Sequence, residues 1–308
     1  MIHVDIEFFK HLYSDDIIYH YTKASTAIDF ILFNNQLRFN KAMMSIDPIE
    51  SKKARRGTVY YSNIDGRESE SHYADINEIH NYVDDMEDQF NLICFCQNHM
   101  GEDFASKNYI SPFKGHEELF GFTKLRMWDQ YADKFSGVCI AFSKEKILSL
   151  NQNLELINGD VQYLTFDKLY IEKVSNIQGD HLKAVGKEHY MKQLKTTIKQ
   201  SFFFKNIDYS GEHEYRIGTL FDKTKCSMEI VQNEPIFDKN MMLDISGCIE
   251  AIFVSSYANE KQKSILMEYA EQLNVKLVEM QWEYNTFEVN DYIDWIKFLK
   301  SIKINSKQ

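Results

Sequence analysis

Apolar and polar positions alternate in short runs along this chain, and helical patterns of uneven length separate these runs. Alternating or continuous apolar runs predict strands at residues 17–22, 37–39, 90–96, 138–142, 161–164, 214–221, 249–254 and 275–281. Apolar residues at helical spacing predict helices at residues 25–33, 122–135, 179–204 and 259–273. Ser25 and Ser143 are expected to cap helix starts. The uneven insertions favour an α+β fold, with a mixed or antiparallel sheet flanked by helices, over a doubly wound fold.

A single domain over residues 1–308 is expected. Three prolines and twelve glycines leave no flexible or stiff linker. Residues from about 58 to 88 are acidic with weak periodicity, so we expect a mobile insertion that ends in a helix and carries little chemistry. Residues from about 286 to 308 are expected to form a C-terminal tail.

Composition and charge narrow the class of protein. The chain has 308 residues and is 44% apolar, enough to bury a full core. Its net charge of -11 disfavours broad binding to nucleic-acid backbones. Five cysteines without a CxxC pair, and no secretory leader, favour a reducing cytosol. Apolar runs fall far short of the roughly 20 residues of a membrane span, so a soluble, cytoplasmic protein without a membrane partner is expected.

The common motifs of phosphate binding and acyl transfer are missing from the sequence. Neither GxGxxG, GxxxxGK[ST] nor GxSxG occurs, which disfavours Rossmann, P-loop and α/β-hydrolase chemistry. Cys94 and Cys96 lie two apart on a predicted strand without a second ligand pair, so we expect buried thiols and no zinc or other metal.

Two polar segments within predicted strands are the main candidates for chemistry. The first, Tyr19-His20-Tyr21-Thr22, contains a histidine that is either a satisfied core residue or a hydrogen-bonding partner of a ligand hydroxyl or carbonyl. In the second segment, strand alternation would place Glu212, Glu214 and Arg216 on one face. That face is either a solvent-exposed ladder or the wall of a cleft. In a cleft, Arg216 would keep one carboxylate ionised while the other has a raised pKa.

Four motifs in order resemble the domain-of-unknown-function 2971 family, over roughly residues 17–285. They are Tyr19-His20-Tyr21-Thr22, Ser45-Ile46-Asp47-Pro48-Ile49-Glu50, Met127-Trp128-Asp129-Gln130-Tyr131-Ala132 with Ser136-Gly137-Val138-Cys139-Ile140-Ala141-Phe142, and Glu212-His213-Glu214-Tyr215-Arg216-Ile217. The early strand, helix and second strand also resemble, more loosely, the opening of bacterial ADP-ribosyltransferase toxins that modify DNA.

The second resemblance implies a split sheet that binds NAD. His20 would hold the nicotinamide ribose, and Glu214 or Glu212 would orient the nucleophile. Tyr21 or Trp128 would stack on the nicotinamide, although an aromatic pair at helical spacing such as Trp128 and Tyr131 more often belongs to the core. The cofactor-binding set is Tyr21, Thr22, Arg38, Trp128, Tyr131 and Arg216, with Arg126 as a further candidate for the pyrophosphate. Phe95-Cys96-Gln97 departs from the Ser or Tyr that such transferases carry on a middle strand.

The sequence therefore predicts an NAD-dependent ADP-ribosyltransferase, a bacterial toxin or phage-defence effector. It would cleave the nicotinamide glycosidic bond and transfer ADP-ribose to a protein or nucleic-acid acceptor, with an antitoxin or defence-system protein as partner. A carboxylate near the ribose would stabilise the oxocarbenium-like centre, without a metal. Three alternatives stay open: an NAD glycohydrolase, a non-catalytic ligand-binding or interaction module, and a magnesium-dependent nuclease built on Glu212, Glu214 and Asp47.

Overall fold

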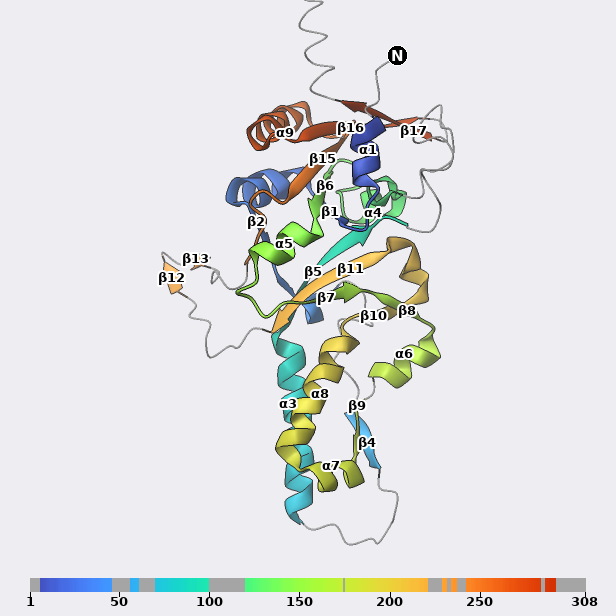
Figure 1. Ribbon diagram of the computed structural model, residues 1–308, viewed down its shortest axis with the longest axis vertical. Helices are drawn as coiled ribbons and strands as arrows, with labels where there is room; N and C mark the ends of the chain where they lie inside the picture. The colour runs from blue at the N-terminus through green and yellow to red at the C-terminus, as the bar shows by residue number, and fades with distance from the viewer. Residues whose placement is uncertain are drawn as a thin grey trace, which may run out of the picture.

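A large mixed sheet flanked by helices forms one part of the molecule, and an arm of helices extends from it (Figure 1). The computed structural model describes residues 6–45, 56–60, 70–99, 120–173, 175–220, 229–231, 234–236, 242–283 and 286–291. The predicted α+β class with a mixed sheet flanked by helices is confirmed.

The main sheet has nine strands in the order β17-β16-β15-β6-β1-β5-β11-β7, with β3 paired to β5 off this path. Only the β15–β16 pair is parallel among the described pairs of this sheet. The strands are β1 (Ile17–Thr22), β3 (Asn40–Lys41), β5 (Phe90–Gln97), β6 (Val138–Ser143), β7 (Ile157–Asp160), β11 (Glu214–Leu220), β15 (Ile249–Ser255), β16 (Lys276–Glu283) and β17 (Thr286–Asp291). Because β17 pairs with β16, the segment expected to be a tail begins as a strand of the sheet.

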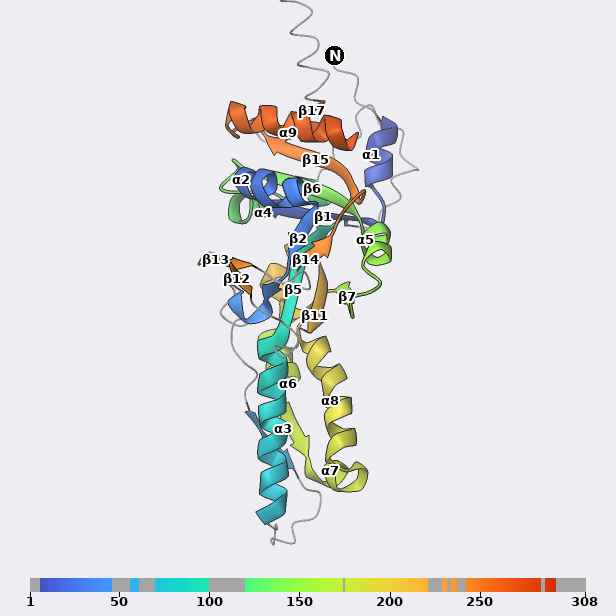
Figure 2. The ribbon, with the colours of Figure 1, turned by 90° about the vertical axis from the view of Figure 1, so that its left-hand side faces the viewer.

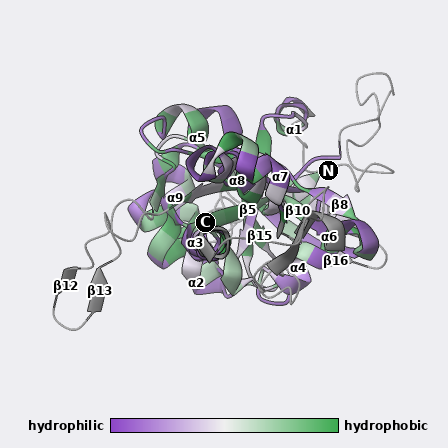
Figure 3. Cartoon of the chain, turned by 90° about the horizontal axis from the view of Figure 1, so that it is seen from below, coloured by the Kyte–Doolittle hydropathy of each residue, from purple (hydrophilic) through white to green (hydrophobic). Residues whose placement is uncertain are grey.

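Helices cover both faces of the sheet, because strand side chains alternate between two cores. Ile18 joins one core, together with residues of α2 (Ala24–Thr26), the π-helix η1 (Ala27–Leu32), α5 (Lys144–Leu150) and α9 (Glu260–Leu273). Tyr19 joins the other, with residues of α1 (Ile6–Leu12), the 3₁₀ turn η4 (Gly121–Thr123) and α4 (Leu125–Gln130). Seen from below, the helices around the sheet carry both hydrophilic and hydrophobic residues (Figure 3). This is typical of helices that pack one face on a core and expose the other to solvent.

One of the two predicted helix caps forms. The Ser143 hydroxyl accepts from the backbone N–H of Lys146 at 3.2 Å and begins α5, as predicted. The prediction for Ser25 is wrong, because the first helix starts at Ala24 after Lys23, without a side-chain cap. The apolar face expected on that helix is nevertheless buried, through Ala24, Ala27, Ile28, Ile31 and Leu32.

The arm consists mainly of two long helices, α3 (Glu70–Gln89) and α8 (Lys187–Ser201), which lie side by side in both views (Figures 1 and 2). At its far end are α7 (Gly179–Val185) and the parallel pair β4 (Arg56–Tyr60) and β9 (Ser175–Gln178). Buried residues of α3 recur at spacings of three and four, and they pack against α7, α8 and β9. They are Ile76, Ile79, Val83 and Met86. Residues 58–88, where the sequence showed only weak periodicity, thus include a helix with a regular buried face. Residues 61–69 of this segment lie outside the described ranges.

The single helix predicted at 179–204 is instead two helices and the strand β10 (Phe204–Asn206). Gly186 separates α7 from α8 with a positive φ of 81°, a conformation that L side chains rarely adopt. The strand β10 pairs in parallel with β8 (Gln162–Leu164) beside the main sheet.

Smaller elements complete the described structure. They are η2 (Ala42–Met44), η5 (Ile207–Glu212), α6 (Phe166–Lys173), the pair β2 (Gln36–Arg38) and β14 (Met242–Asp244), and the pair β12 (Glu229–Val231) and β13 (Glu234–Ile236). Every helix in the described ranges is too short or too polar to span a membrane.

Candidate functional site

The sheet opens between two of its central strands. β1 pairs with β6 along its whole length, from Ile17 to Thr22. Its described pairing with β5 ends at Tyr19 opposite Cys96. Beyond that point the strand pairing between β1 and β5 does not continue.

His20 lies at this opening. Its Nδ1 is 3.0 Å from the carbonyl oxygen of Cys94, and its ring meets Phe95 edge-on at 5.8 Å. Because a carbonyl only accepts, Nδ1 carries the hydrogen, and Nε2 of the neutral ring is an acceptor. Burial lowers the pKa of His20 below its usual value, although the bond to Cys94 opposes this, so the ring is neutral at pH 7.

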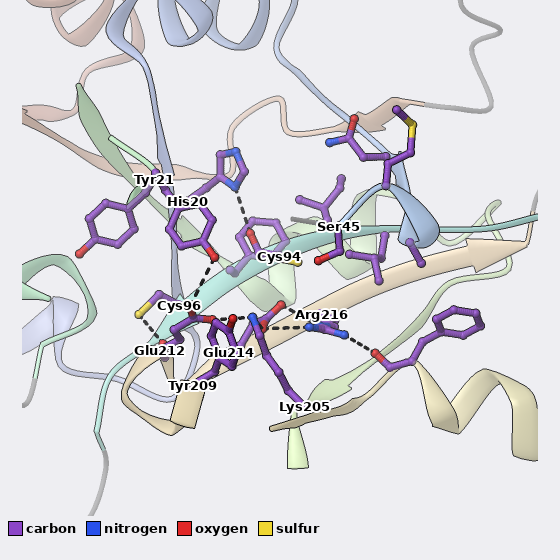
Figure 4. A pocket seen from close by; sticks show the side chains of 18 of the residues that line it. His20, Tyr21, Ser45, Cys94, Cys96, Lys205, Tyr209, Glu212, Glu214 and Arg216 are labelled. Atoms are coloured by element: carbon purple, nitrogen blue, oxygen red, sulfur yellow. Dashed lines mark hydrogen bonds and ion pairs between the residues drawn. The ribbon is translucent and has the colours of Figure 1, made fainter. Parts of the chain in front are cut away.

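A cavity of about 660 Å³ lies across the opening. Tyr19, Cys96 and Glu214 stand opposite one another on neighbouring strands, so they share one face of the sheet. His20, the next residue along β1, belongs to the other face. Figure 4 shows His20 on one side of the β5 ribbon and the acidic cluster, Glu212 and Glu214, on the other. All three residues line the same cavity.

Glu214 is held by two cations at the start of β11. Its two oxygens accept from Arg216, at 2.7 Å from Nε and 3.0 Å from a terminal nitrogen, and Oε2 also accepts from Lys205 at 3.0 Å. Burial alone would raise the pKa of Glu214, but Arg216 and Lys205 outweigh it and lower the pKa to about 2. Glu214 is therefore ionised throughout the physiological range.

Glu212 reaches the same cluster by a different route from the one predicted. It ends η5, and His213 follows in the left-handed conformation with a φ of 46°, so Glu212 is not on the strand. Its Oε2 accepts from Lys205 at 2.7 Å, and its Oε1 is 3.4 Å from the Tyr131 hydroxyl. Burial raises the pKa of Glu212, and Lys205 partly counters the effect. The predicted contrast between an ionised carboxylate and one with a raised pKa is thus present.

Lys205 and Tyr209 line the cavity and were missed by the sequence analysis. Lys205 bridges both glutamates from β10, with its side chain 5% exposed, and its Nζ lies 4.6 Å from the centre of the Tyr209 ring. Nothing in the local sequence indicates that this lysine is buried. Its position follows only from the pairing of β10 with β8.

Three further residues of the predicted cofactor-binding set line the cavity, namely Tyr21, Arg38 and Tyr131. The Tyr21 hydroxyl donates to the carbonyl oxygen of Gly121 at 2.6 Å. Arg38 is exposed and donates to Asn40 at 3.3 Å, while Arg216 lines the wall but is bound to Glu214.

Thr22 and Trp128 lie elsewhere, and Arg126 is outside the cavity lining. Trp128 is fully buried, donates to Phe122 at 2.8 Å and meets the Tyr21 ring edge-on at 5.4 Å. The structure places it in the core, behind a cavity residue, instead of on the wall. Arg126 donates to the carbonyl of Asp208 at 2.9 Å.

The expectation of two buried thiols at Cys94 and Cys96 holds only in part. Cys96 is buried, but Cys94 is exposed and lines the cavity, so the expectation of two buried thiols is wrong for Cys94. In the described ranges, no three His, Cys, Asp or Glu side chains are grouped to hold a metal ion. Asp47, a proposed ligand of the nuclease alternative, lies outside those ranges.

Comparisons with known proteins support the first resemblance. The family described as "Protein of unknown function (DUF2971)" matches residues 127–217. This segment includes Tyr131, Lys205 and Glu212–Arg216, but it is narrower than the expected residues 17–285 and leaves out His20. No curated protein and no solved structure matches the chain.

Proposed function

We propose that the protein is an NAD-dependent ADP-ribosyltransferase whose substrate binds in the cavity at the opening of the sheet. The observation that carries the proposal is that His20 and the Glu212–Glu214 cluster, distant in sequence, line one cavity. Its volume of about 660 Å³ is typical of sites for small molecules and cofactors. An opening between central strands is also what the resemblance to ADP-ribosyltransferases implies.

In this proposal His20 holds a ribose of NAD. With its Nδ1 hydrogen directed to Cys94, Nε2 accepts a hydrogen bond from a ribose hydroxyl. The neutral ring adds no positive charge near the reacting centre, where positive charge develops on the ribose.

Glu212 is the carboxylate we assign to the reaction, in preference to Glu214. Both oxygens of Glu214 are taken up by Arg216 and Lys205, whereas Oε1 of Glu212 has only a long contact of 3.4 Å to Tyr131 among its described contacts. The bond from ribose C1′ to the nicotinamide nitrogen breaks, and the electron pair leaves with nicotinamide. Glu212 stabilises the oxocarbenium-like centre. The acceptor then bonds to C1′ and loses its proton to Glu212.

The pyrophosphate of NAD is assigned to two other cations that line the cavity. Arg38 and Lys41 both line it and both are exposed. A guanidinium is suited to paired phosphate oxygens. Arg216, considered from the sequence for the same role, is instead committed to Glu214.

The biological setting belongs to the same proposal. The acceptor is a protein or a nucleic acid, and the protein acts in the cytoplasm as a toxin or phage-defence effector that an antitoxin or defence-system partner restrains. Transfer of ADP-ribose requires such an acceptor, because the reaction becomes NAD glycohydrolysis when water takes the acceptor's place.

The test is to incubate the full chain with NAD labelled in the adenylate, together with DNA, RNA or protein acceptors. We expect free nicotinamide and label on one acceptor, and a loss of about 100-fold or more in both for Glu212→Gln. Nicotinamide without labelled acceptor would identify a glycohydrolase. No nicotinamide and no label would contradict both activities.

One observation favours a second candidate, a ligand-binding module without catalysis. The Glu214, Arg216 and Lys205 contacts are satisfied within the protein, as in a structural network. NAD that binds to the wild-type protein without any release of nicotinamide would identify this function.

A further inference from the structure

Lys205 is a buried cation in contact with both cavity glutamates. Its Nζ is 2.7 Å from Glu212 and 3.0 Å from Glu214, and it lies over the face of the Tyr209 ring at 4.6 Å. Lysine is almost never fully buried unless it is paired. The ammonium group therefore has a specific place in the cluster, as Figure 4 shows.

The position of the Lys205 backbone does not depend on its contacts with the two glutamate carboxylates. Lys205 on β10 stands opposite Tyr163 of β8 in the parallel pair. The Tyr163 hydroxyl in turn accepts from the backbone N–H of Glu214 at 2.8 Å. The lysine thus joins the start of β11 to a separate small sheet, and its long side chain has a defined origin.

Each of the two carboxylates has a cation as its main partner. Arg216 binds both oxygens of Glu214, with contacts of 2.7 and 3.0 Å. Lys205 makes the shorter of its two contacts to Glu212. Removing Lys205 would leave Glu212 buried beside an ionised Glu214, without the cation that touches it.

We propose that Lys205 is a positioning residue, which fixes Oε2 of Glu212 and so presents Oε1 of the same carboxylate to the substrate. This role rests on the proposed function, in which Glu212 is the reacting carboxylate. Tyr131, 3.4 Å from Oε1, marks the side of Glu212 at which a ribose or acceptor hydroxyl would bind.

The same contact keeps Glu212 in its useful form. Burial raises the pKa of Glu212, while the Lys205 ammonium lowers it and the Glu214 carboxylate raises it. Without Lys205 the Glu212 pKa rises further, and a protonated carboxyl can neither stabilise positive charge nor accept a proton. The charged and titratable groups near Glu212 come from several elements: Cys96 on β5, Arg126 on α4, Tyr131 after α4, Lys205 on β10 and Glu214 on β11.

The test measures the titration of Glu212 itself, in the absence of NAD. Protein labelled with ¹³C at the glutamate carboxyl carbons is titrated by NMR, and Glu212→Gln assigns the resonance. We expect Lys205→Met to move the Glu212 midpoint upward by about one to three pH units. Lys205→Arg, which keeps the charge, should restore the wild-type midpoint.

Lys263→Met is the matched control, because Lys263 is also buried and bound to carboxylates, at 2.9 Å from Glu260 and 2.8 Å from Glu279. It should leave the Glu212 midpoint unchanged. If Lys205→Met does not fold, Lys205→Gln replaces it, since an amide still donates to Glu212 without a charge.

An unchanged Glu212 midpoint in the folded variant would overturn the proposal. The acid limb of the pH profile for nicotinamide release should move with the midpoint. A shifted midpoint in a protein that never cleaves NAD would instead overturn the proposed function while the positioning of Glu212 by Lys205 stands.

Discussion

The two cavity glutamates differ in charge because of their immediate neighbours. Glu214 faces a guanidinium that binds both of its oxygens, and Glu212 faces an ammonium that it shares. Both carboxylates are buried, so desolvation acts on each, and the number of cations in contact decides which stays ionised at low pH.

Glu214→Gln should destabilise the protein strongly at neutral pH. It removes the charge of the carboxylate that binds the buried Arg216, and breaking a buried pair in this way costs about 3–5 kcal/mol. Urea unfolding at pH 7 measures the loss. Glu7→Gln is the control, because the pair of Glu7 with Lys10 is exposed and its loss costs less than about 1 kcal/mol. Equal effects of the two substitutions would contradict the account.

The stability supplied by Glu214 should disappear in acid. Its folded-state pKa of about 2 lies below the ordinary value of 4.5, so the ionised form favours folding above pH 4.5 and this contribution is lost as the pH falls toward 2. The loss amounts to about 3 kcal/mol. Urea unfolding of wild type and Glu214→Gln between pH 5 and pH 2.5 should show the gap in unfolding free energy narrowing. A constant gap would contradict the low pKa.

Sequence alone could indicate part of this chemistry. The i and i+2 spacing of Glu214 and Arg216 on a strand predicted their contact correctly. Glu212 and Glu214 were expected to converge by the same alternation, but the left-handed turn at His213 brings them together instead. A histidine in this conformation has no reliable signature in a single sequence. Lys205 was missed because its burial depends on the pairing of β10 with β8, a strand distant in the chain.

Local sequence patterns predict a helix or strand correctly where the element buries one face or all of its side chains. The predicted strands that became β1, β5, β6, β11 and β15 combine apolar runs with β-branched or aromatic residues. Prediction failed where a polar surface hides the pattern. In α3, the buried positions from Ile76 to Met86 stand among acidic residues, so the helix was read as an insertion.

Gly186 should be required for the break between α7 and α8. Its φ of 81° and ψ of 156° are almost restricted to glycine, so Gly186→Ala should cost about 1–3 kcal/mol even though nothing lies within 4 Å of the added Cβ. Gly211→Ala is the control, because its Cβ is equally unobstructed and its φ is not in the left-handed region. Thermal unfolding of both variants measures the difference. Equal melting temperatures would show that the Gly186 conformation carries no strain.

The cavity is a property of the whole molecule. Its walls come from β1, the segment from Arg38 to Ser45, the middle of β5, the end of α4 and the chain from Ser201 to Arg216. The match to the family of unknown function covers the acidic wall but not His20. No local pattern could predict that β1 and β5 part after Tyr19, since the separation depends on pairing between strands far apart in sequence.

A calorimetric titration of NAD into the wild-type protein and into His20→Ala tests whether NAD binds at the opening of the sheet. We expect one NAD per chain in the wild type, and binding weakened about tenfold by His20→Ala, the effect of one lost hydrogen bond of about 1.4 kcal/mol. His189→Ala, an exposed histidine on α8, should bind as the wild type does. Absence of NAD binding to the wild type, or equal affinity in wild type and His20→Ala, would contradict the account.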